Sequence, residues 1–153
     1  MVADRRLLPQ RSAPGAAGSD TLLDTGVLVA LYNRADPVHQ RAQDWLAGFH
    51  GQLHSVEPVL SEAAFFLPAR LRPALADLAA AGTVRIHHPD TSGLARIAQL
   101  LRKYESLDPD WADACLVWLA EHLGTQRIAT IDITDFSVYR IHGRKRFELA
   151  LLG

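Results

Sequence analysis

Short apolar runs bounded by polar or turn-forming residues recur along the chain, and longer segments of helical periodicity separate them. The runs TLLDT (21–25), LHSV (53–56), TVRIH (83–87) and RIATI (127–131) have the length and composition of buried β-strands. A final strand is expected near RFELALL (146–152). Strands and helices are therefore expected to alternate along the chain.

Turn and cap residues mark where the helices between these strands begin and end. Pro37 opens an amphipathic segment, and Pro58 lies just inside the next helix. The tripeptide DPD at 108–110 predicts the start of a long helix, with Asp108 as N-cap and Pro109 in the first helical position. The predicted helices cover 27–33, 37–50, 58–67, 73–81, a segment from Leu94 to Tyr104, 109–123 and a short stretch near Asp135.

This alternation predicts the α/β class, as a three-layer α/β/α sandwich with a mainly parallel central sheet that helices cover on both faces. A length of 153 residues suits one domain. Residues 9–19, PQRSAPGAAGS, are rich in Pro, Gly, Ser and Ala. Residues 1–20 are therefore expected to form a flexible leader, and residues 21–153 the folded domain.

The overall composition excludes several classes of protein. The net charge of −1, from 16 basic and 17 acidic residues, predicts no polyanion partner from bulk charge alone. The single cysteine, Cys115, excludes an intrachain disulfide and a cysteine-based zinc site, and it suits a reduced, cytoplasmic setting. The seven histidines share no ligand-like spacing and are expected at the surface or in loops. No apolar run approaches the roughly 20 residues of a membrane-spanning helix, so no membrane partner is expected.

Acidic residues follow the predicted strands at the points where each strand ends. Asp24 ends the first strand, and Glu62 lies early in the helix after the second strand. Asp113 lies in the first turn of a later helix, and Asp132 and Asp135 flank the end of the strand RIATI. In a parallel sheet, strand ends and the following helix starts share one edge. These five carboxylates are therefore expected to converge.

Converging carboxylates repel one another unless one is protonated or a cation lies between them. Mg²⁺ and Mn²⁺ take oxygen ligands, so two or three carboxylates and several waters can hold either ion. Each acid also has an ordinary structural interpretation. Asp113 could stabilise a helix dipole, and Asp132 and Asp135 could be turn or N-cap residues. The convergence of all of them favours a metal site.

Four motifs, in this order along the chain, resemble those of PIN-domain proteins. They are LLDTGVLVALYNRADPVHQRA, VLSEAAFFL, WADACLVWLAEHLG and RIATIDITDFSVYR. The likeness spans about Thr21 to Leu152, and the most similar group is that of the VapC-type toxins of bacterial toxin–antitoxin pairs. At Gly26, many relatives carry a larger residue. The resemblance implies a PIN-like fold for residues 21–153.

The resemblance also implies a function, a Mg²⁺- or Mn²⁺-dependent endoribonuclease. The carboxylates would hold the ion and position the attacking water. Asp132 and Asp135 both remain candidates for the fourth acid, because family members often have Asn where Asp132 stands. The hydroxyls of Thr25 and Thr130 would lie near the metal. The implied catalytic residues are Asp24, Glu62, Asp113, Asp132 and Asp135, and all of these except Glu62 would be metal ligands.

The partners implied by the resemblance are an RNA substrate, a cognate antitoxin and a second copy of the chain. Apolar helices, such as the one with Trp45 or the one with Phe65 and Phe66, could supply the protein-binding surfaces. The best basic segment could hold RNA phosphates, or it could equally be a solvated turn between two late strands. Its basic residues are Arg140, Arg144, Lys145 and Arg146.

Two other functions were weighed against this one. The first is a catalytically silent PIN fold that binds RNA or a protein partner. It is disfavoured because no acidic position of the pattern is lost. The second is a phosphatase of the haloacid-dehalogenase type, since LLDTG resembles its first motif. That motif requires a second Asp two residues after the first, and Gly26 stands there instead.

Overall fold

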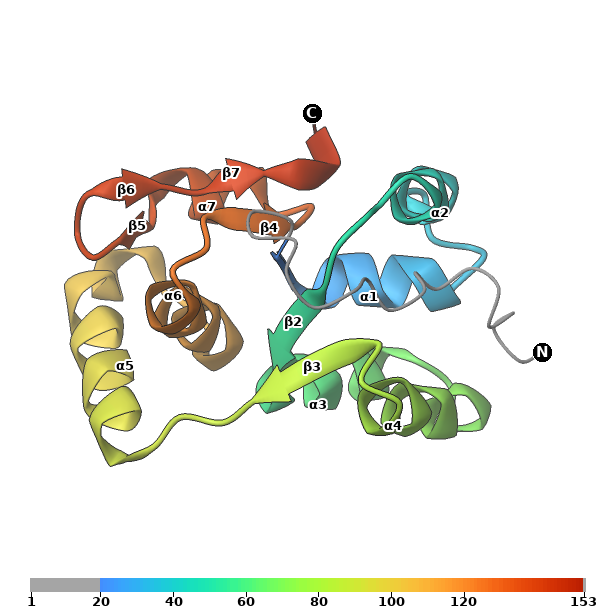
Figure 1. Cartoon of the computed structure of the whole chain (residues 1–153), viewed down its shortest axis with the longest axis horizontal. Helices are drawn as coiled ribbons and strands as arrows, with labels where there is room; N and C mark the ends of the chain where they lie inside the picture. Colours follow the sequence, from blue (N-terminus) through green and yellow to red (C-terminus); the bar gives the residue numbers. More distant parts are fainter. Residues whose placement is uncertain (1–19, 153) are drawn as a thin grey trace.

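The computed structural model describes residues 20–152 (Figure 1). Except for Asp20, the predicted leader therefore lies outside the described residues. Five strands form one parallel sheet in the order β3-β2-β1-β4-β7, and β5 and β6 form a separate antiparallel hairpin. The strands are β1 (Thr21–Leu23), β2 (Leu53–Val56), β3 (Val84–His87), β4 (Arg127–Ala129), β5 (Arg140–Ile141), β6 (Lys145–Arg146) and β7 (Glu148–Leu149).

Helices connect these strands as the predicted alternation requires. Figure 1 shows α5 and α6 on one side of the sheet, with α1, α2 and α4 on the other. The predicted three-layer α/β/α sandwich with a parallel central sheet is thus confirmed. The helices are α1 (Thr25–Tyr32), α2 (His39–Ala47), α3 (Glu57–Phe66), α4 (Arg72–Ala80), α5 (Thr91–Lys103), α6 (Trp111–Leu123) and α7 (Ile133–Val138), with short 3-10 turns at Ala69–Leu71, Glu105–Leu107 and Ala150–Leu152.

The neighbouring strands β1 and β2 are buried because helices cover both faces of the sheet there. Every residue of β1 and β2 is buried, as expected for parallel strands between helical layers. From β1 the chain moves outward through β2 to β3, and it then returns through α5 and α6 to β4 on the other side of β1. The strand order therefore reverses between β1 and β4. In open parallel sheets, the crevice beyond the carboxyl ends of two such strands is the usual ligand site.

The structure corrects the predicted start of the long helix. Asp108 has a left-handed backbone conformation (φ 49°) and is not the N-cap. The helix α6 instead begins at Trp111, and its N-cap is Asp110, whose carboxylate accepts the backbone N–H of Asp113 at 2.7 Å. Pro109 consequently lies before the helix rather than in its first turn. Asp and Pro are both common at helix starts, so the spacing alone did not distinguish the two aspartates.

The end of the chain also differs from the prediction. The single strand expected over 146–152 is divided into the end of the hairpin, the two-residue strand β7 and a final 3-10 turn. Only β7 joins the central sheet, next to β4. Among the described residues, no helix is both long and apolar enough to span a bilayer.

Candidate metal-dependent nuclease site

Asp24 lies at the reversal of strand order, directly after β1. Its backbone N–H donates to the carbonyl of Ala129 at the end of β4, which fixes the residue against the sheet. Its side chain is the N-cap of α1, because Oδ1 accepts the N–H of Thr25 at 2.8 Å. Oδ2 accepts the hydroxyl of Thr130 at 2.7 Å. The carboxylate therefore has a defined position.

Thr130 links Asp24 to the loop that follows β4. Its oxygen accepts the backbone N–H of Asp132 at 2.9 Å while its hydroxyl donates to Asp24. Asp132 is the N-cap of α7, and its carboxylate accepts the N–H of Asp135 at 3.0 Å. The structural interpretation of Asp132 as a cap is therefore correct. It also brings a second carboxylate, that of Asp135, to the same end of α7.

Asp113 approaches this loop from the first turn of α6. Asp110 is the N-cap of α6, so the Asp110 side chain lies at the same end of this helix as Asp113. Both residues line one pocket. The hydroxyl of Tyr139 donates to Oδ2 of Asp113 at 3.1 Å, and both residues are buried. Tyr139 follows the last residue of α7, so this bond connects α6 to the end of α7.

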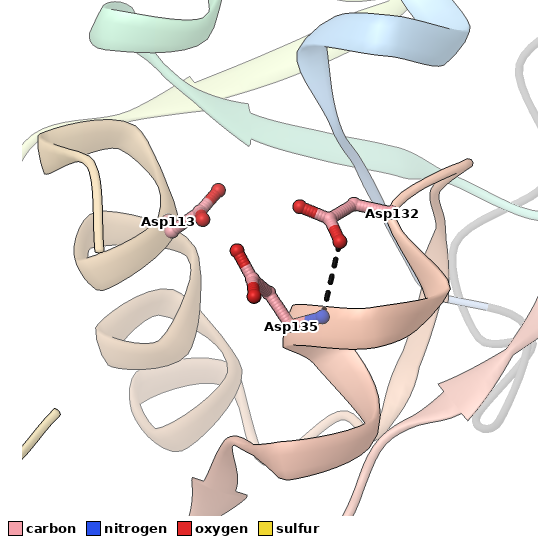
Figure 2. A group of neighbouring side chains, drawn as sticks. All are labelled: Asp113, Asp132 and Asp135. Atoms are coloured by element: carbon pink, nitrogen blue, oxygen red, sulfur yellow. Dashed lines mark hydrogen bonds between the residues drawn. The ribbon is translucent and has the colours of Figure 1, made fainter. Parts of the chain in front are cut away.

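Three of these carboxylates face a common space (Figure 2). One oxygen each from Asp113, Asp132 and Asp135 can be chosen so that all three atoms lie within 4.8 Å of one another. Asp24 and Glu62 are not part of this group of three, which we call the acid cluster. Both Asp132 and Asp135 belong to the acid cluster, so the structure brings each candidate for the fourth acid to the site.

Glu62 lies across the pocket on α3. It is half-buried, and one of its carboxylate oxygens accepts the hydroxyl of Thr25 at 2.9 Å. Thr25 therefore holds Asp24 through its backbone and Glu62 through its side chain. The pocket between these elements has a volume of about 450 Å³. Its lining residues are Asp24, Thr25, Gly26, Val29, Asn33, Asp36, Glu62, Phe66, Asp110, Asp113, Ile131 and Asp132.

The carboxylates at this end of the pocket are held in an environment that disfavours their charged forms. Burial raises the pKa of Asp24 to about 6, against the opposing effect of its hydrogen bonds to Thr130 and Thr25. Burial, and then the charges of Asp110 and Asp24, raises the pKa of Asp113 to about 8. Burial and the charge of Asp132 also raise the pKa of Asp135. These acids thus lack a compensating positive charge.

The donor set of the acid cluster fits a hard divalent cation. The pocket lining, as far as the described residues go, contains no Lys or Arg that could neutralise the carboxylates. All the groups that face the shared space are oxygen donors, which are the ligands that Mg²⁺ and Mn²⁺ take. An ion held there would offset the burial and the mutual repulsion that raise the pKa values of these carboxylates.

Two residues of the site were not among the sequence-based candidates. Asp110 was interpreted only as part of a helix start, although its position three residues before Asp113 was a usable signal. Tyr139 had no such signal, since its contact with Asp113 joins residues that are 26 positions apart. The two hydroxyls that were predicted near the site donate to its acids: Thr25 donates to Glu62, and Thr130 donates to Asp24.

Gly26 has a steric role in this pocket. A Cβ atom on Gly26 would lie 2.7 Å from Cγ1 and 2.8 Å from Cδ1 of Ile131. The absence of a side chain therefore lets Ile131, which follows Thr130, lie directly against the start of α1. The larger residue of many relatives would require Ile131 to move.

The predicted basic segment forms the β5–β6 hairpin. Arg140 is engaged within the chain, because one guanidinium nitrogen donates to the carbonyls of Ser137 and Val138 at 2.8 Å and of Tyr139 at 3.1 Å. It thereby caps the carboxyl end of α7. The exposed side chains left for RNA phosphates are those of Arg144, Lys145 and Arg146. The same segment forms the turn between β5 and β6, which is what the alternative interpretation predicted.

The histidines were expected at the surface or in loops, and His54 contradicts this. It is buried in β2, with Nε2 3.1 Å from a carboxylate oxygen of Asp20 and Nδ1 2.9 Å from Nε2 of His87. Burial, and then the proximity of His54, lowers the pKa of His87 to about 4. These residues form a chain of hydrogen bonds rather than a set of converging ligands.

Comparison with known proteins agrees with the geometry. The PIN domain family matches residues 21–140, so this chain belongs to that family and the predicted resemblance is confirmed. Among solved structures, the chain resembles VapC20 of Mycobacterium tuberculosis, described as a toxin that cleaves the sarcin–ricin loop. The two share 22% identity over 76% of this chain and 92% of that chain, with a TM-score of 0.70.

A second similar structure is a toxin–antitoxin complex from Klebsiella pneumoniae. It shares 18% identity over 77% of this chain and 91% of that chain, with a TM-score of 0.60. No match was found among curated protein sequences. At these identities the two structures show the fold alone, which this chain shares with both.

Proposed function

We propose that this protein is a metal-dependent endoribonuclease that hydrolyses RNA phosphodiester bonds, and that residues 21–153 form its nuclease domain. The observation that carries the proposal is the acid cluster, whose three carboxylate oxygens lie within 4.8 Å of one another. Beside it, the buried Asp24 also lacks a positive partner among the described residues of the pocket. A chain that needed these acids only for stability would be better served by neutral or paired side chains.

Some residues of the site would bind the ion, and others orient the carboxylates by hydrogen bonds. Asp113, Asp132 and Asp135 would be the metal ligands, together with Asp24 on the other side of Thr130. A bound Mg²⁺ or Mn²⁺ supplies positive charge that activates water and stabilises the phosphodiester in the transition state. Thr25 and Thr130 orient carboxylates through their hydroxyls.

Glu62 has a separate role in the proposal. It lines the same pocket without belonging to the acid cluster, and burial raises its pKa from the ordinary value. A carboxylate with a raised pKa is a better proton acceptor near neutral pH. Glu62 would therefore take the proton of the attacking water, with Thr25 holding its carboxylate in place.

The direct test is cleavage of a single-stranded RNA in Mg²⁺ or Mn²⁺. We expect Asp24→Asn to lower the rate at least about 100-fold, since it removes charge from the proposed metal site. The matched control is Asp44→Asn, because Asp44 is an exposed aspartate of α2 outside the pocket. EDTA should abolish cleavage, and added Mn²⁺ should restore it. Equal rates for wild type, D24N and D44N, or RNA binding without cleavage, would reject the proposal.

We further propose that the protein is the cytoplasmic toxin of a type II toxin–antitoxin pair and forms a homodimer. The support is the fold, which is that of a VapC toxin and of a protein in a toxin–antitoxin complex. Co-expression with the product of the neighbouring gene, followed by light scattering of the purified material, tests both partners. A monomer that does not retain that product would contradict this assignment.

A further inference from the structure

The pocket extends beyond the carboxylates along two helices. On α1, Gly26 and Val29 lie on one helical face, and Asn33 is the C-cap residue that follows the helix. On α3, Glu62 and Phe66 lie on one face. All five line the pocket. The hydrogen bond from Thr25 to Glu62 joins the two helices at the acidic end. Phe66 lies about one helical turn beyond Glu62, and Asn33 about two turns beyond Gly26.

Phe66 is largely exposed to solvent, unlike some other apolar residues of α3. Its side chain is 62% exposed, although Val59 and Ala63 on the same helix are fully buried. Its neighbour Phe65 is 79% exposed and contacts Phe66 edge to face, with ring centroids 5.3 Å apart. Only Phe66 lines the pocket. The Phe66 side chain is thus an exposed aromatic residue in the same pocket as the carboxylates.

Two polar side chains complete this part of the pocket. Oδ1 of Asn33 accepts the N–H of Ala35 at 3.0 Å, and Oδ1 of Asp36 accepts the N–H of Val38 at 2.9 Å. These bonds fix both side chains in the turn after α1. The amide group of Asn33 and the second carboxylate oxygen of Asp36 have no hydrogen-bond partner in the part of the chain that the structure describes. A donor from Asn33 and an acceptor from Asp36 are therefore available in the same pocket.

We propose that this end of the pocket binds one unpaired RNA base next to the phosphate that is cut. This inference rests on the proposed ribonuclease function. The base stacks on Phe66, and its edge bonds to the amide of Asn33 and the carboxylate of Asp36. Proteins that read single-stranded RNA combine stacking on an aromatic ring with hydrogen bonds to the base edge.

The charges favour a base over the other possible occupants. A phosphate would lie beside the carboxylates of Asp36 and Glu62, with no Lys or Arg among the described lining residues to balance it. An apolar partner helix would bury Asn33 and Asp36 without hydrogen-bond partners, which is unfavourable. A base has an apolar face for Phe66 and a polar edge for these two groups, so it satisfies both.

The first test compares Phe66→Ala with Phe65→Ala as the matched control. With a short single-site RNA in Mn²⁺, F66A should lower kcat/KM roughly 5- to 100-fold, the range for the loss of one base–aromatic stack. F65A should cleave as wild type. Removing the base at one position of the RNA should cause at least as large a loss in wild type, and a smaller loss in F66A than in wild type, because F66A has already lost the stack. Equal losses in F65A and F66A, or additive effects of F66A and base removal, would overturn the proposal.

The second test measures binding without chemistry. An RNA with 2-aminopurine at the same position should lose fluorescence on binding to D113N, and the double variant D113N/F66A should not cause this loss. Asp36→Asn keeps the cap on Val38 but replaces the free acceptor with a donor, so it should change which of the four bases is preferred there. Unchanged quenching in D113N/F66A would overturn the stacking. An unchanged base preference in D36N would overturn the edge contact.

These outcomes separate this inference from the proposed function. If wild type does not cleave RNA in any metal, the ribonuclease proposal fails. If wild type cleaves but F66A cleaves equally well and no longer binds the neighbouring gene's product, the surface belongs to a protein partner. In that case the base subsite is wrong while the nuclease assignment stands.

Discussion

The helix α6 carries two buried carboxylates, one near each end, and their surroundings are opposite. Near the carboxyl end, Glu121 accepts hydrogen bonds from two guanidinium nitrogens of Arg96, at 2.8 and 2.9 Å. The Arg96 guanidinium lowers the pKa of Glu121 against the effect of burial. Near the amino end, Asp113 accepts a bond from neutral Tyr139 and faces Asp110 and Asp24. Its pKa is raised to about 8.

The two ends therefore differ in where the neutralising charge comes from. For Glu121 it is a side chain of the same fold, which crosslinks α5 to α6. For Asp113 no basic side chain lines the described pocket. Under the proposed function, the Glu121 carboxylate is paired within the chain, whereas a metal ion from solution would neutralise the Asp113 carboxylate. The pairing state, rather than burial, distinguishes the two uses.

The largest expected effect is on cleavage. Asp113→Asn should lower the rate of RNA hydrolysis at least about 100-fold, because it removes a charged ligand from the acid cluster. Glu121→Gln removes a partly buried carboxylate of the same helix and should leave kcat within about twofold of wild type at a temperature where both are folded. A similar loss in D113N and E121Q would show that the two carboxylates do not differ in function.

The next effect is a change in the free energy of unfolding with pH and with Mg²⁺. The folded pKa of Asp113 is about 8, above its ordinary 3.8, so between these values the metal-free folded chain holds a proton that the unfolded chain has lost. The free energy of unfolding should therefore fall as pH rises from about 4 to about 8. Mg²⁺ should raise Tm by a few degrees, and more at pH 8 than at pH 5.

Thermal denaturation with and without EDTA measures this effect, and D113N is the control. That variant should show a weaker loss of stability with rising pH and a smaller Mg²⁺ shift. A Tm that does not respond to Mg²⁺ at either pH would contradict the assignment of a metal site.

A smaller effect is expected on the stability that the Glu121–Arg96 pair contributes to the fold. E121Q should lower the free energy of unfolding by about 1–2 kcal/mol, since charged hydrogen bonds are lost but Arg96 is partly exposed. Because the folded pKa of Glu121 is lowered, its contribution is present above its unfolded pKa and disappears as pH falls through the folded pKa. Urea denaturation at pH 7 and at pH 3 measures this, with Arg102→Met as an exposed control on α5. Equal losses at both pH values would contradict the pairing.

The smallest effect is expected at the β5–β6 hairpin, which Glu121 of α6 also contacts. Glu121 also accepts the backbone N–H of His142 at 2.7 Å, which fixes the turn before Arg144. The triple variant R144A/K145A/R146A should weaken RNA binding several-fold at low salt and reduce the salt dependence of binding. Arg70→Ala, an exposed arginine beyond α3, is the control. Filter binding at two salt concentrations measures it, and an unchanged salt slope would exclude these residues from RNA binding.

Much of the fold and the placement of the acids follow from local sequence. The apolar runs at β1 and β2 are buried strands because a parallel sheet between two helical layers has no polar face. Once strands and helices alternate, the connection rules bring strand ends to one edge. Asp24 and Asp132 were therefore predictable as neighbours, although their residues are far apart in the sequence. The order of the four motifs was sufficient to indicate the family.

Other features were decided only by the tertiary structure. Tyr139 on Asp113, Arg96 on Glu121 and the contact of Gly26 with Ile131 each join elements whose distance depends on how the helices pack. Side-chain pairs of this kind leave no periodicity or local motif in the sequence. The same holds for the pKa values, because burial and neighbouring charge are properties of the assembled fold. Local sequence predicts that the acids lie at one edge of the sheet, because parallel strands end there. The packing of α6 and α7 determines which of them form the acid cluster and which lack a positive partner.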